Sequence, residues 1–237
     1  MAACLYNLSM QFNEAQIQAI QHNTGPCMVI AGPGSGKTTV LTHRVRYLIE
    51  RYGVNPSDIL VITFTKAAAE QMKLKFKGLS EGRNSAVTFG TFHAVFFTIL
   101  KAASNYSAHC IIKPQIQHEF VKDQMCRLEL EYDDENEAVA GVLSEISCVK
   151  GEDVNIDEYE SRCIPPQSFR IMYRAYDDML VRKHLIDFDD MIVQCRELLM
   201  QREDYRRAWQ NKYKYILIDE FQDINYRQYC IVRLHVY

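Results

Sequence analysis

Short runs of apolar residues alternate with longer segments in which apolar and polar residues recur at helical spacing. The apolar runs are bounded by turn residues and predict four buried strands, at 27–31, 59–64, 86–89 and 215–218. Helical spacing is found at 38–51, 66–78, 91–102 and 187–200. This alternation predicts an α/β fold, in which helices flank a parallel sheet on both faces.

The middle of the chain, residues 101–186, has a different pattern. It contains no convincing strand, carries the acidic run ELEYDDENE and is interrupted by Pro165-Pro166. The sequence therefore predicts a mostly helical subdomain at 101–186, inserted into a discontinuous α/β domain formed by 1–100 and 187–237.

Composition changes this picture little. With 48% hydrophobic and 24% charged residues the chain is ordinary for a globular protein, and its net charge of −3 indicates no bulk affinity for nucleic acid. The eight cysteines form no CxxC pair and have no close histidine, so neither a zinc site nor a disulfide framework is expected. Neither a signal peptide nor a membrane span is recognisable, and we expect a soluble, cytoplasmic protein.

The segment AGPGSGKTT fits the relaxed phosphate-loop pattern between a predicted strand and a predicted helix. Glycines let backbone N–H groups turn inward around a phosphate, and the helix directs its positive end at the same anion. Lys37 is placed to reach the β- and γ-phosphates, and the Thr38 hydroxyl to bind Mg²⁺. The predicted nucleotide-binding residues of this loop are Ala31, Gly32, Pro33, Gly34, Ser35, Gly36, Lys37, Thr38 and Thr39.

The predicted strand at 215–218 delivers two carboxylates, Asp219 and Glu220, to its C-terminal end. Open α/β sheets bind ligands at this edge, so Asp219 is expected to hold Mg²⁺ and Glu220 to activate or orient the attacking water. Adjacent carboxylates after a strand are also common as solvated strand ends. The phosphate loop 182 residues earlier favours the catalytic interpretation, and the long separation supports an insertion.

Taken together, six ordered segments resemble the UvrD/Rep/PcrA branch of superfamily 1 DNA helicases. FNEAQ at 12–16 resembles the family's glutamine motif, and AGPGSGKTTVLTHRVRYLI its first helicase motif. The other four segments are VITFTKAAAEQM, GTFHA, DFDDMI and IDEFQD with the later Gln228-Tyr229. The resemblance implies a RecA-like, phosphate-loop first motor domain with ATP and Mg²⁺ as cofactors. A phosphate-loop kinase or unrelated ATPase is the competing enzyme class, disfavoured by the TFH and DEFQD segments.

The same resemblance implies roles for further residues. Gln16 would hydrogen-bond the adenine edge, Gln222 would lie beside the γ-phosphate, and Arg44 would lie near the nucleotide, although it could equally be a solvated helix residue. Single-stranded DNA would be contacted by Phe64, Thr65, Thr91 and His93. Phe64 as plain core and His93 as a buried histidine stay open. The basic run of Lys66, Lys73, Lys75, Lys77 and Arg83 fits a solvated helix face nearly as well as a phosphate track.

Two departures from the family pattern bear on function. The motif-Ia lysine is shifted by one position in Thr65-Lys66-Ala67, and no segment resembling the second motor domain follows IDEFQD. The ending RLHVY also leaves the apolar pattern, which suggests a truncation or an altered reading frame. The expectation is an ATP-driven 3′→5′ DNA translocase whose 237 residues alone hydrolyse ATP poorly and unwind nothing. The alternatives are a nucleotide- or DNA-binding remnant and one half of a helicase whose second motor domain is separately encoded.

Overall fold

Two compact units make up the chain in the computed structural model, which describes residues 12–80 and 86–236. Unit 1 consists of Met1–Phe92 and Gln210–Gln222, and unit 2 of His93–Trp209 and Asp223–Tyr237. The chain passes between the two units at 93, 210 and 223, and the helical insertion at 101–186 stays a prediction.

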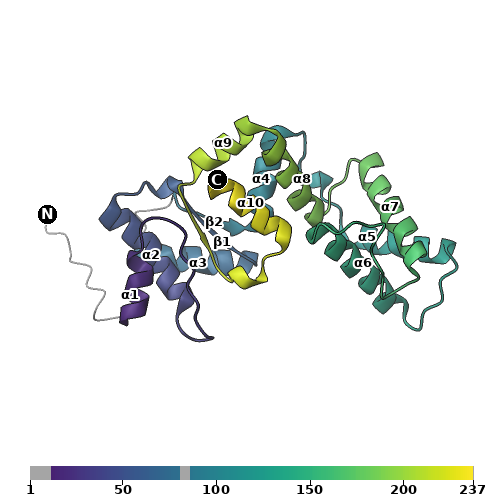
Figure 1. Cartoon of the computed structure of the whole chain (residues 1–237), viewed down its shortest axis with the longest axis horizontal. Coiled ribbons are helices and arrows are strands. Elements are labelled where there is room, and N and C mark those ends of the chain that lie inside the picture. Colours follow the sequence, from purple (N-terminus) through teal and green to yellow (C-terminus); the bar gives the residue numbers. More distant parts are fainter. Residues whose placement is uncertain (1–11, 81–85, 237) are drawn as a thin grey trace. The chain divides into compact units, whose positions relative to one another are not determined.

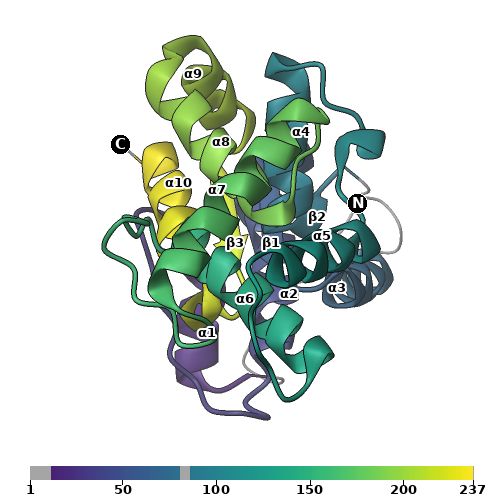
Figure 2. The ribbon, with the colours of Figure 1, turned by 90° about the vertical axis from the view of Figure 1, so that its right-hand side faces the viewer.

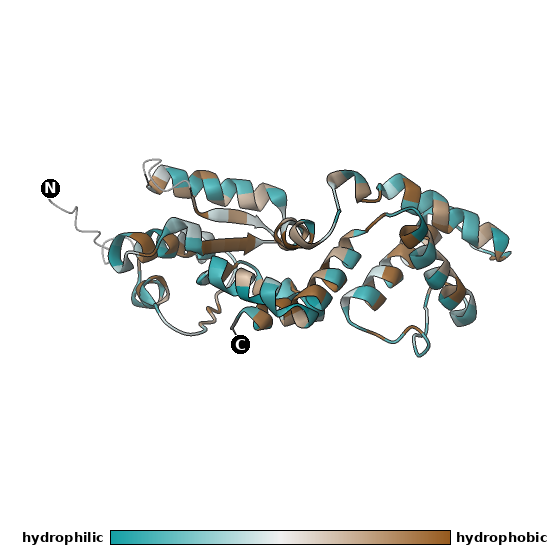
Figure 3. Ribbon diagram, turned by 90° about the horizontal axis from the view of Figure 1, so that it is seen from above, coloured by the Kyte–Doolittle hydropathy of each residue, from teal (hydrophilic) through white to brown (hydrophobic). Residues whose placement is uncertain are grey.

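Unit 1 contains a three-stranded parallel sheet with the order β2-β1-β3 (Figure 1). Its strands are β1 (Ile59–Thr63), β2 (Thr88–Thr91) and β3 (Tyr215–Ile218). All five residues of β1 are buried, and β1 is the central strand: Val61 lies opposite Phe89 of β2 and Leu217 of β3. In Figure 3 one strand is brown along its length and another is paler, whereas the helices carry both colours. The predicted α/β class and two of the predicted strands are thus confirmed, and the third is shifted from 86–89 to 88–91.

The predicted strand at 27–31 is wrong. These residues form neither a strand nor a helix, and Met28, Val29 and Ile30 are 70%, 53% and 91% exposed. An apolar run indicates that burial would be favourable, but a strand also needs a partner edge. Within the described residues the sheet consists of β2, β1 and β3, and no strand pairs with 27–31.

The helices of unit 1 pack beside this sheet. The predicted helices at 38–51 and 66–78 are present as α2 (Lys37–Tyr52) and α3 (Lys66–Leu79). Short helix α1 (Glu14–Gln21) packs on α2, and α2 packs on α3. The core between sheet and helices contains Val45, Leu48, Ile59, Val61, Met72, Phe76, Val87 and Leu217.

Unit 2 is helical. It contains α5 (Pro114–Arg127), α6 (Glu135–Gly151) and α7 (Pro166–Arg182), whose facing sides share one core that includes Val121, Val142 and Phe169 (Figure 2). The other helices are α8 (Phe188–Gln201) and α10 (Tyr226–Val236), together with most of α4 (Phe92–Ala103) and α9 (Glu203–Lys212). Helix α10 extends to Val236 and so includes most of the ending that leaves the apolar pattern. No helix in the described part of the chain is long and apolar enough to cross a membrane.

Candidate nucleotide-binding site

The phosphate loop of unit 1 leads directly into α2. Gly34 and Gly36 have φ values of +73° and +81°, a backbone conformation that favours glycine. Gly36 is also the N-cap of α2 and provides no side-chain acceptor, so the first N–H groups of the helix are left for an anion. A Cβ added at Gly32 or Gly34 would meet nothing within 4 Å, which leaves space around the loop for a phosphate.

Lys37 joins the phosphate loop to the end of β3. Its Nζ lies 3.5 Å from the carbonyl oxygen of Ala31 and 3.9 Å from Oε1 of Glu220. Glu220 in turn accepts a hydrogen bond at 2.6 Å from Nε2 of Gln222. The structure therefore brings together three of the four predicted catalytic side chains, Lys37, Glu220 and Gln222.

Asp219, the fourth of these residues, directly follows β3 at the C-terminal end of the sheet. Its N–H donates to the carbonyl of Ile62 at 2.9 Å, which fixes the backbone of Asp219 beside the end of β1. Burial, and then the charge of Glu220, raise the pKa of the Asp219 carboxyl above its usual range. The next residue, Glu220, has a φ of +51°, a strained conformation that turns its side chain out of the strand alternation.

This donor set suits Mg²⁺. No group of three or more histidine, cysteine or carboxylate side chains within the described residues could hold a metal by itself. Mg²⁺ in nucleotide sites usually binds only one or two protein oxygens, with water and phosphate as its other ligands. A desolvated carboxylate at Asp219 with a second negative charge beside it favours a cation, and Thr38 follows Lys37 in the first turn of α2.

Gln16 lies against the phosphate loop. Its Nε2 donates to the carbonyl of Ser35 at 3.1 Å, and its Oε1 accepts from the N–H of Asn13 at 3.0 Å. The second bond is half of a capping box at the start of α1, in which Asn13 Oδ1 accepts from the N–H of Gln16. Residues 16 and 31–39, predicted from separate motifs, therefore meet at one place.

The sequence profile of the UvrD/REP helicase N-terminal domain matches residues 12–236. The chain belongs to this family. Rep of Escherichia coli (strain K12) is 34% identical over 234 residues, which are 96% of this chain and 34% of Rep. YjcD of Bacillus subtilis (strain 168) is 34% identical over 95% of the chain and 30% of its own length. PcrA of Staphylococcus epidermidis (strain RP62A) is 31% identical over 96% of the chain and 32% of its own length.

The chain thus spans about a third of the length of the curated relatives it matches. Rep and PcrA are both named ATP-dependent DNA helicases. Their names agree with the phosphate loop and the carboxylates of this UvrD/REP-type domain.

Arg44 does not point to the phosphate loop in this UvrD/REP-type domain. Its Nη1 donates to the carbonyl of Ala19 at 3.0 Å and also to the carbonyl of His22, both at the C-terminal end of α1. A direct contact with nucleotide stays a prediction. Thr39, the last residue of the predicted loop, accepts a hydrogen bond at 2.7 Å from Lys75 of α3. Within the basic run, Lys75 is therefore engaged with α2, and Arg83 lies outside the described residues.

Three predicted DNA contacts lie at the C-terminal ends of β1 and β2 in unit 1. Phe64 follows β1, is 38% exposed and packs edge-to-face on Phe92 with 6.0 Å between ring centroids. The Thr65 hydroxyl accepts from the N–H of Ala68 and so caps α3. Thr91 ends β2 opposite Thr63. Phe64 is thus partly available for stacking, whereas the Thr65 hydroxyl already has a structural partner.

The fourth predicted contact, His93, lies in unit 2 beside a residue that the sequence did not single out. Its ring packs edge-to-face on Phe188, with 5.2 Å between centroids, and Phe188 is 52% exposed. Burial lowers the pKa of His93, so the ring is neutral and can offer a hydrogen bond but no charge. Both rings line a cavity of about 430 Å³, to which Gln117, Tyr176 and Asp189 also contribute. The signal in the sequence that could have found Phe188 is a phenylalanine at the start of a predicted helix, directly after the capping Asp187.

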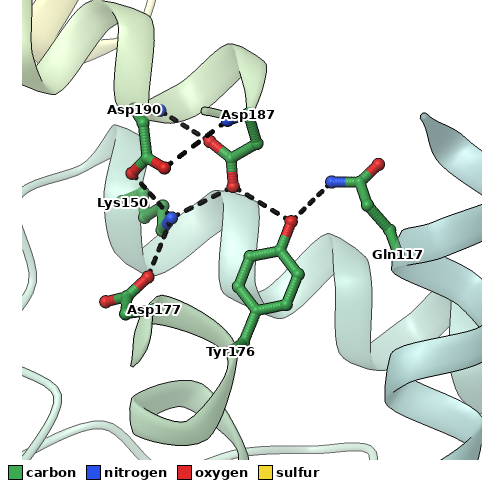
Figure 4. A network of polar contacts seen from close by, with 6 residues as sticks. All are labelled: Gln117, Lys150, Tyr176, Asp177, Asp187 and Asp190. Carbon is green, nitrogen blue, oxygen red and sulfur yellow. Dashed lines mark hydrogen bonds and ion pairs between the residues drawn. The ribbon is translucent and has the colours of Figure 1, made fainter. Parts of the chain in front are cut away.

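A buried ion-pair network lies at the start of α8, next to Phe188 in the sequence (Figure 4). Lys150 of α6 is 3% exposed, and its Nζ lies 3.0 Å from Asp187, 2.7 Å from Asp190 and 2.9 Å from Asp177. Asp187 also accepts from the N–H of Asp190 at 2.7 Å and thereby caps the start of α8. Burial alone would lower the pKa of Lys150, but the three carboxylates outweigh it and raise the pKa. Lys150 therefore ties α6 and α7 to the turn that carries Phe188.

Proposed function

We propose that this chain is the ATP-binding part of an ATP-dependent DNA helicase that moves 3′→5′ along single-stranded DNA. The observation that carries the proposal is the 3.9 Å approach of Lys37 Nζ to Glu220 Oε1, which joins the phosphate loop to the carboxylates after β3. Membership of the UvrD/REP family and the names of Rep and PcrA support ATP as the nucleotide.

In this proposal the phosphate loop and the first turn of α2 bind the triphosphate. The backbone N–H groups after Gly34 and Gly36 and the Lys37 ammonium supply positive charge where the γ-phosphate accumulates negative charge. Thr38 and Asp219 would hold Mg²⁺, which when bound neutralises part of the phosphate charge. Residues 31–36 and Thr39 shape the loop around the phosphates.

Glu220 is the proposed base or water-orienting residue. Its carboxylate is held from one side by Lys37 and from the other by the Gln222 amide. Displacement of Lys37 toward a bound phosphate would free one oxygen of Glu220 for water. Gln222 would then report the presence of the γ-phosphate through its bond to Glu220. Gln16 would read the adenine edge at the other end of the site.

Single-stranded DNA is the proposed partner. Phe64 at the end of β1 and Phe188 at the start of α8 each offer a partly exposed ring on which a base can stack. Thr65, Thr91 and His93 would contact sugar and phosphate, His93 as a neutral hydrogen-bonding group.

The matched residues account for about a third of Rep, YjcD and PcrA. We therefore propose that these 237 residues, assayed by themselves, bind Mg-ATP weakly, hydrolyse it slowly and do not unwind DNA. The remaining parts of a motor, in the same polypeptide or in a separately encoded partner, would supply transition-state arginines worth about 10³–10⁵ in rate.

Titration of the 237-residue chain with a fluorescent ATP analogue, with and without Mg²⁺, tests the proposal. We expect saturable, Mg²⁺-dependent binding that is lost in Lys37→Ala and retained in Lys183→Ala, a change at the exposed C-cap of α7. Binding that Lys37→Ala does not reduce would overturn the proposal. Rapid DNA-stimulated turnover by the 237 residues would contradict the expected low activity.

A further inference from the structure

The C-terminal end of α1 is held by side chains from α2. The last carbonyl groups of a helix have no partner within the helix, and those of α1 are satisfied from outside. Arg44 donates to the carbonyls of Ala19 and His22, and the Tyr52 hydroxyl donates to the carbonyl of Gln21 at 2.9 Å. A guanidinium at this end also complements the negative pole of the helix. Arg44 is partly buried, and this burial lowers the pKa of its guanidinium, whereas Tyr52 is 42% exposed.

The N-terminal end of the same helix carries Gln16, whose amide is held in one orientation. Oε1 faces the N–H of Asn13, and Nε2 faces the carbonyl of Ser35. A reversed amide would place two donors together at Asn13 and two acceptors together at Ser35. The surroundings of Gln16 therefore determine which of its atoms donates and which accepts.

Among the described residues, each of these two amide atoms retains one free hydrogen-bonding position. A carboxamide oxygen accepts two hydrogen bonds and its NH₂ group donates two, and one of each is used here. The remaining acceptor and donor match adenine, which offers its 6-amino group and N7. Guanine presents the acceptor O6 in place of the amino group, and this would oppose Oε1 of Gln16. The fixed orientation of the amide thus selects between the two purines.

Resting on the proposed ATP site, we propose that Arg44 is a positioning residue that sets the preference for adenine over guanine nucleotides without touching the nucleotide. Gln16 and Ala19 are three residues apart and so lie one above the other, one turn apart, on the same side of α1. A helix of eight residues is only about 12 Å long and moves as a unit, so the contacts of Arg44 at its end fix the amide at its start. The contact between Gln16 and Ser35 then sets this helix relative to the phosphate loop.

The test compares ATP and GTP affinity in the complete 237-residue chain, measured by competition against a fluorescent nucleotide. Arg44→Met removes the donors while keeping an apolar stem of similar length. We expect the ratio of ATP to GTP affinity to fall about tenfold, the size expected for losing a hydrogen-bond pair to a charged group. Tyr52→Phe, an isosteric change that removes one hydroxyl, should lower the same ratio by about two- to threefold. Arg51→Met, an exposed arginine of the same helix, is the matched control and should leave the ratio unchanged.

Gln16→Ala and Lys37→Ala separate this inference from the proposed function. Lys37→Ala should reduce ATP and GTP affinity alike. Gln16→Ala should abolish the preference, and Arg44→Met added to Gln16→Ala should then have no further effect on the ratio. If Gln16→Ala abolishes the preference while Arg44→Met and Tyr52→Phe leave it intact, the inference is overturned and the nucleotide site stands. If Gln16→Ala itself leaves the preference intact, the adenine-reading role fails, and Arg44 with it.

Discussion

Nζ of Lys37 lies 3.9 Å from Oε1 of Glu220, and the two side chains are 31% and 40% exposed. An ion pair this accessible to water contributes little to stability, so its main consequence is for the site. The pair holds the phosphate-binding cation and the proposed base in register before any phosphate is present. Binding of a triphosphate then competes with Glu220 for Lys37.

Glu220→Gln should therefore separate binding from hydrolysis. The amide is close in size to the carboxylate but cannot accept a proton or hold Lys37 as strongly. We expect single-turnover ATP hydrolysis to fall about 10²–10⁴-fold, while the affinity for Mg-ATP stays equal or rises. Rapid-quench hydrolysis and nucleotide titration measure the two quantities. A loss of affinity similar to that of Lys37→Ala would show that Glu220 acts in binding instead.

Lys150→Met should strongly destabilise unit 2. The substitution keeps the packing of the stem but leaves Asp187 and Asp190 buried without their cation. Removing one member of a buried ion pair costs about 3–5 kcal/mol in free energy of unfolding. Trp209, the chain's only tryptophan, is buried in unit 2 and reports urea unfolding by its fluorescence. Asp177→Asn is the control, because Asp177 is 41% exposed. Loss of its charge should lower the unfolding free energy by at most about 1 kcal/mol.

The free energy of unfolding of unit 2 should depend on pH with an unusual sign. Burial, and then the charge of Asp187, raise the pKa of Asp189 and that of Asp190 to about 6. A carboxyl whose pKa is higher in the folded state binds its proton more tightly there, so it stabilises the fold below about pH 4. That stability is lost as the pH rises from 4 through 6. Lys150 and a hydrogen bond from Ser147 oppose the shift at Asp189, but burial prevails.

Asp189→Asn isolates this effect. The variant cannot ionise, so relative to the unmodified chain it should gain about 1–3 kcal/mol of unfolding free energy at pH 7.5 and nothing at pH 4. Urea unfolding followed by Trp209 fluorescence at several pH values measures the difference. A constant difference between the two proteins across this range would show that Asp189 keeps its ordinary pKa.

More of the sheet than of the Lys150 ion-pair network could be predicted from the sequence. Apolar runs located β1, which is buried on both faces, and β3, which is mostly half-buried, because both strands consist of a continuous run of apolar residues. The same signal failed at 27–31, since an apolar run indicates that burial would be favourable but does not encode whether the segment pairs with another strand. Lys150 gave no local signal at all: its aspartates lie 27 to 40 residues away, and only the fold brings them together. The phosphate loop and Gln16 were predictable because their chemistry depends on local sequence.

Because segment 27–31 is largely exposed, we expect it to tolerate substitution of its apolar residues. Ile30 is 91% exposed, so Ile30→Ala should change the unfolding free energy of the 237-residue chain by no more than about 0.5 kcal/mol. Ile62→Ala in the fully paired strand β1 should cost about 2–5 kcal/mol, because Ile62 is 1% exposed. Circular dichroism during urea unfolding compares the two. Equal losses would mean that 27–31 is buried in solution.

Phe64 provides a test of the DNA-binding proposal that is independent of nucleotide. Its ring is 38% exposed at the end of β1 and packs edge-to-face with Phe92, so part of the ring is open to water. Stacking of one base on such a ring is worth about 1–3 kcal/mol, and Phe64→Ala should weaken binding of labelled single-stranded oligothymidylate by about 5- to 100-fold. Phe64→Leu keeps the apolar contact with Phe92 but removes the flat face, and it should lose nearly as much. Leu74→Ala, a change to a 69% exposed residue of α3, is the control and should leave the fluorescence anisotropy titration unchanged. If Phe64→Leu binds DNA normally while Phe64→Ala does not, the ring acts as core packing, and the base must stack elsewhere.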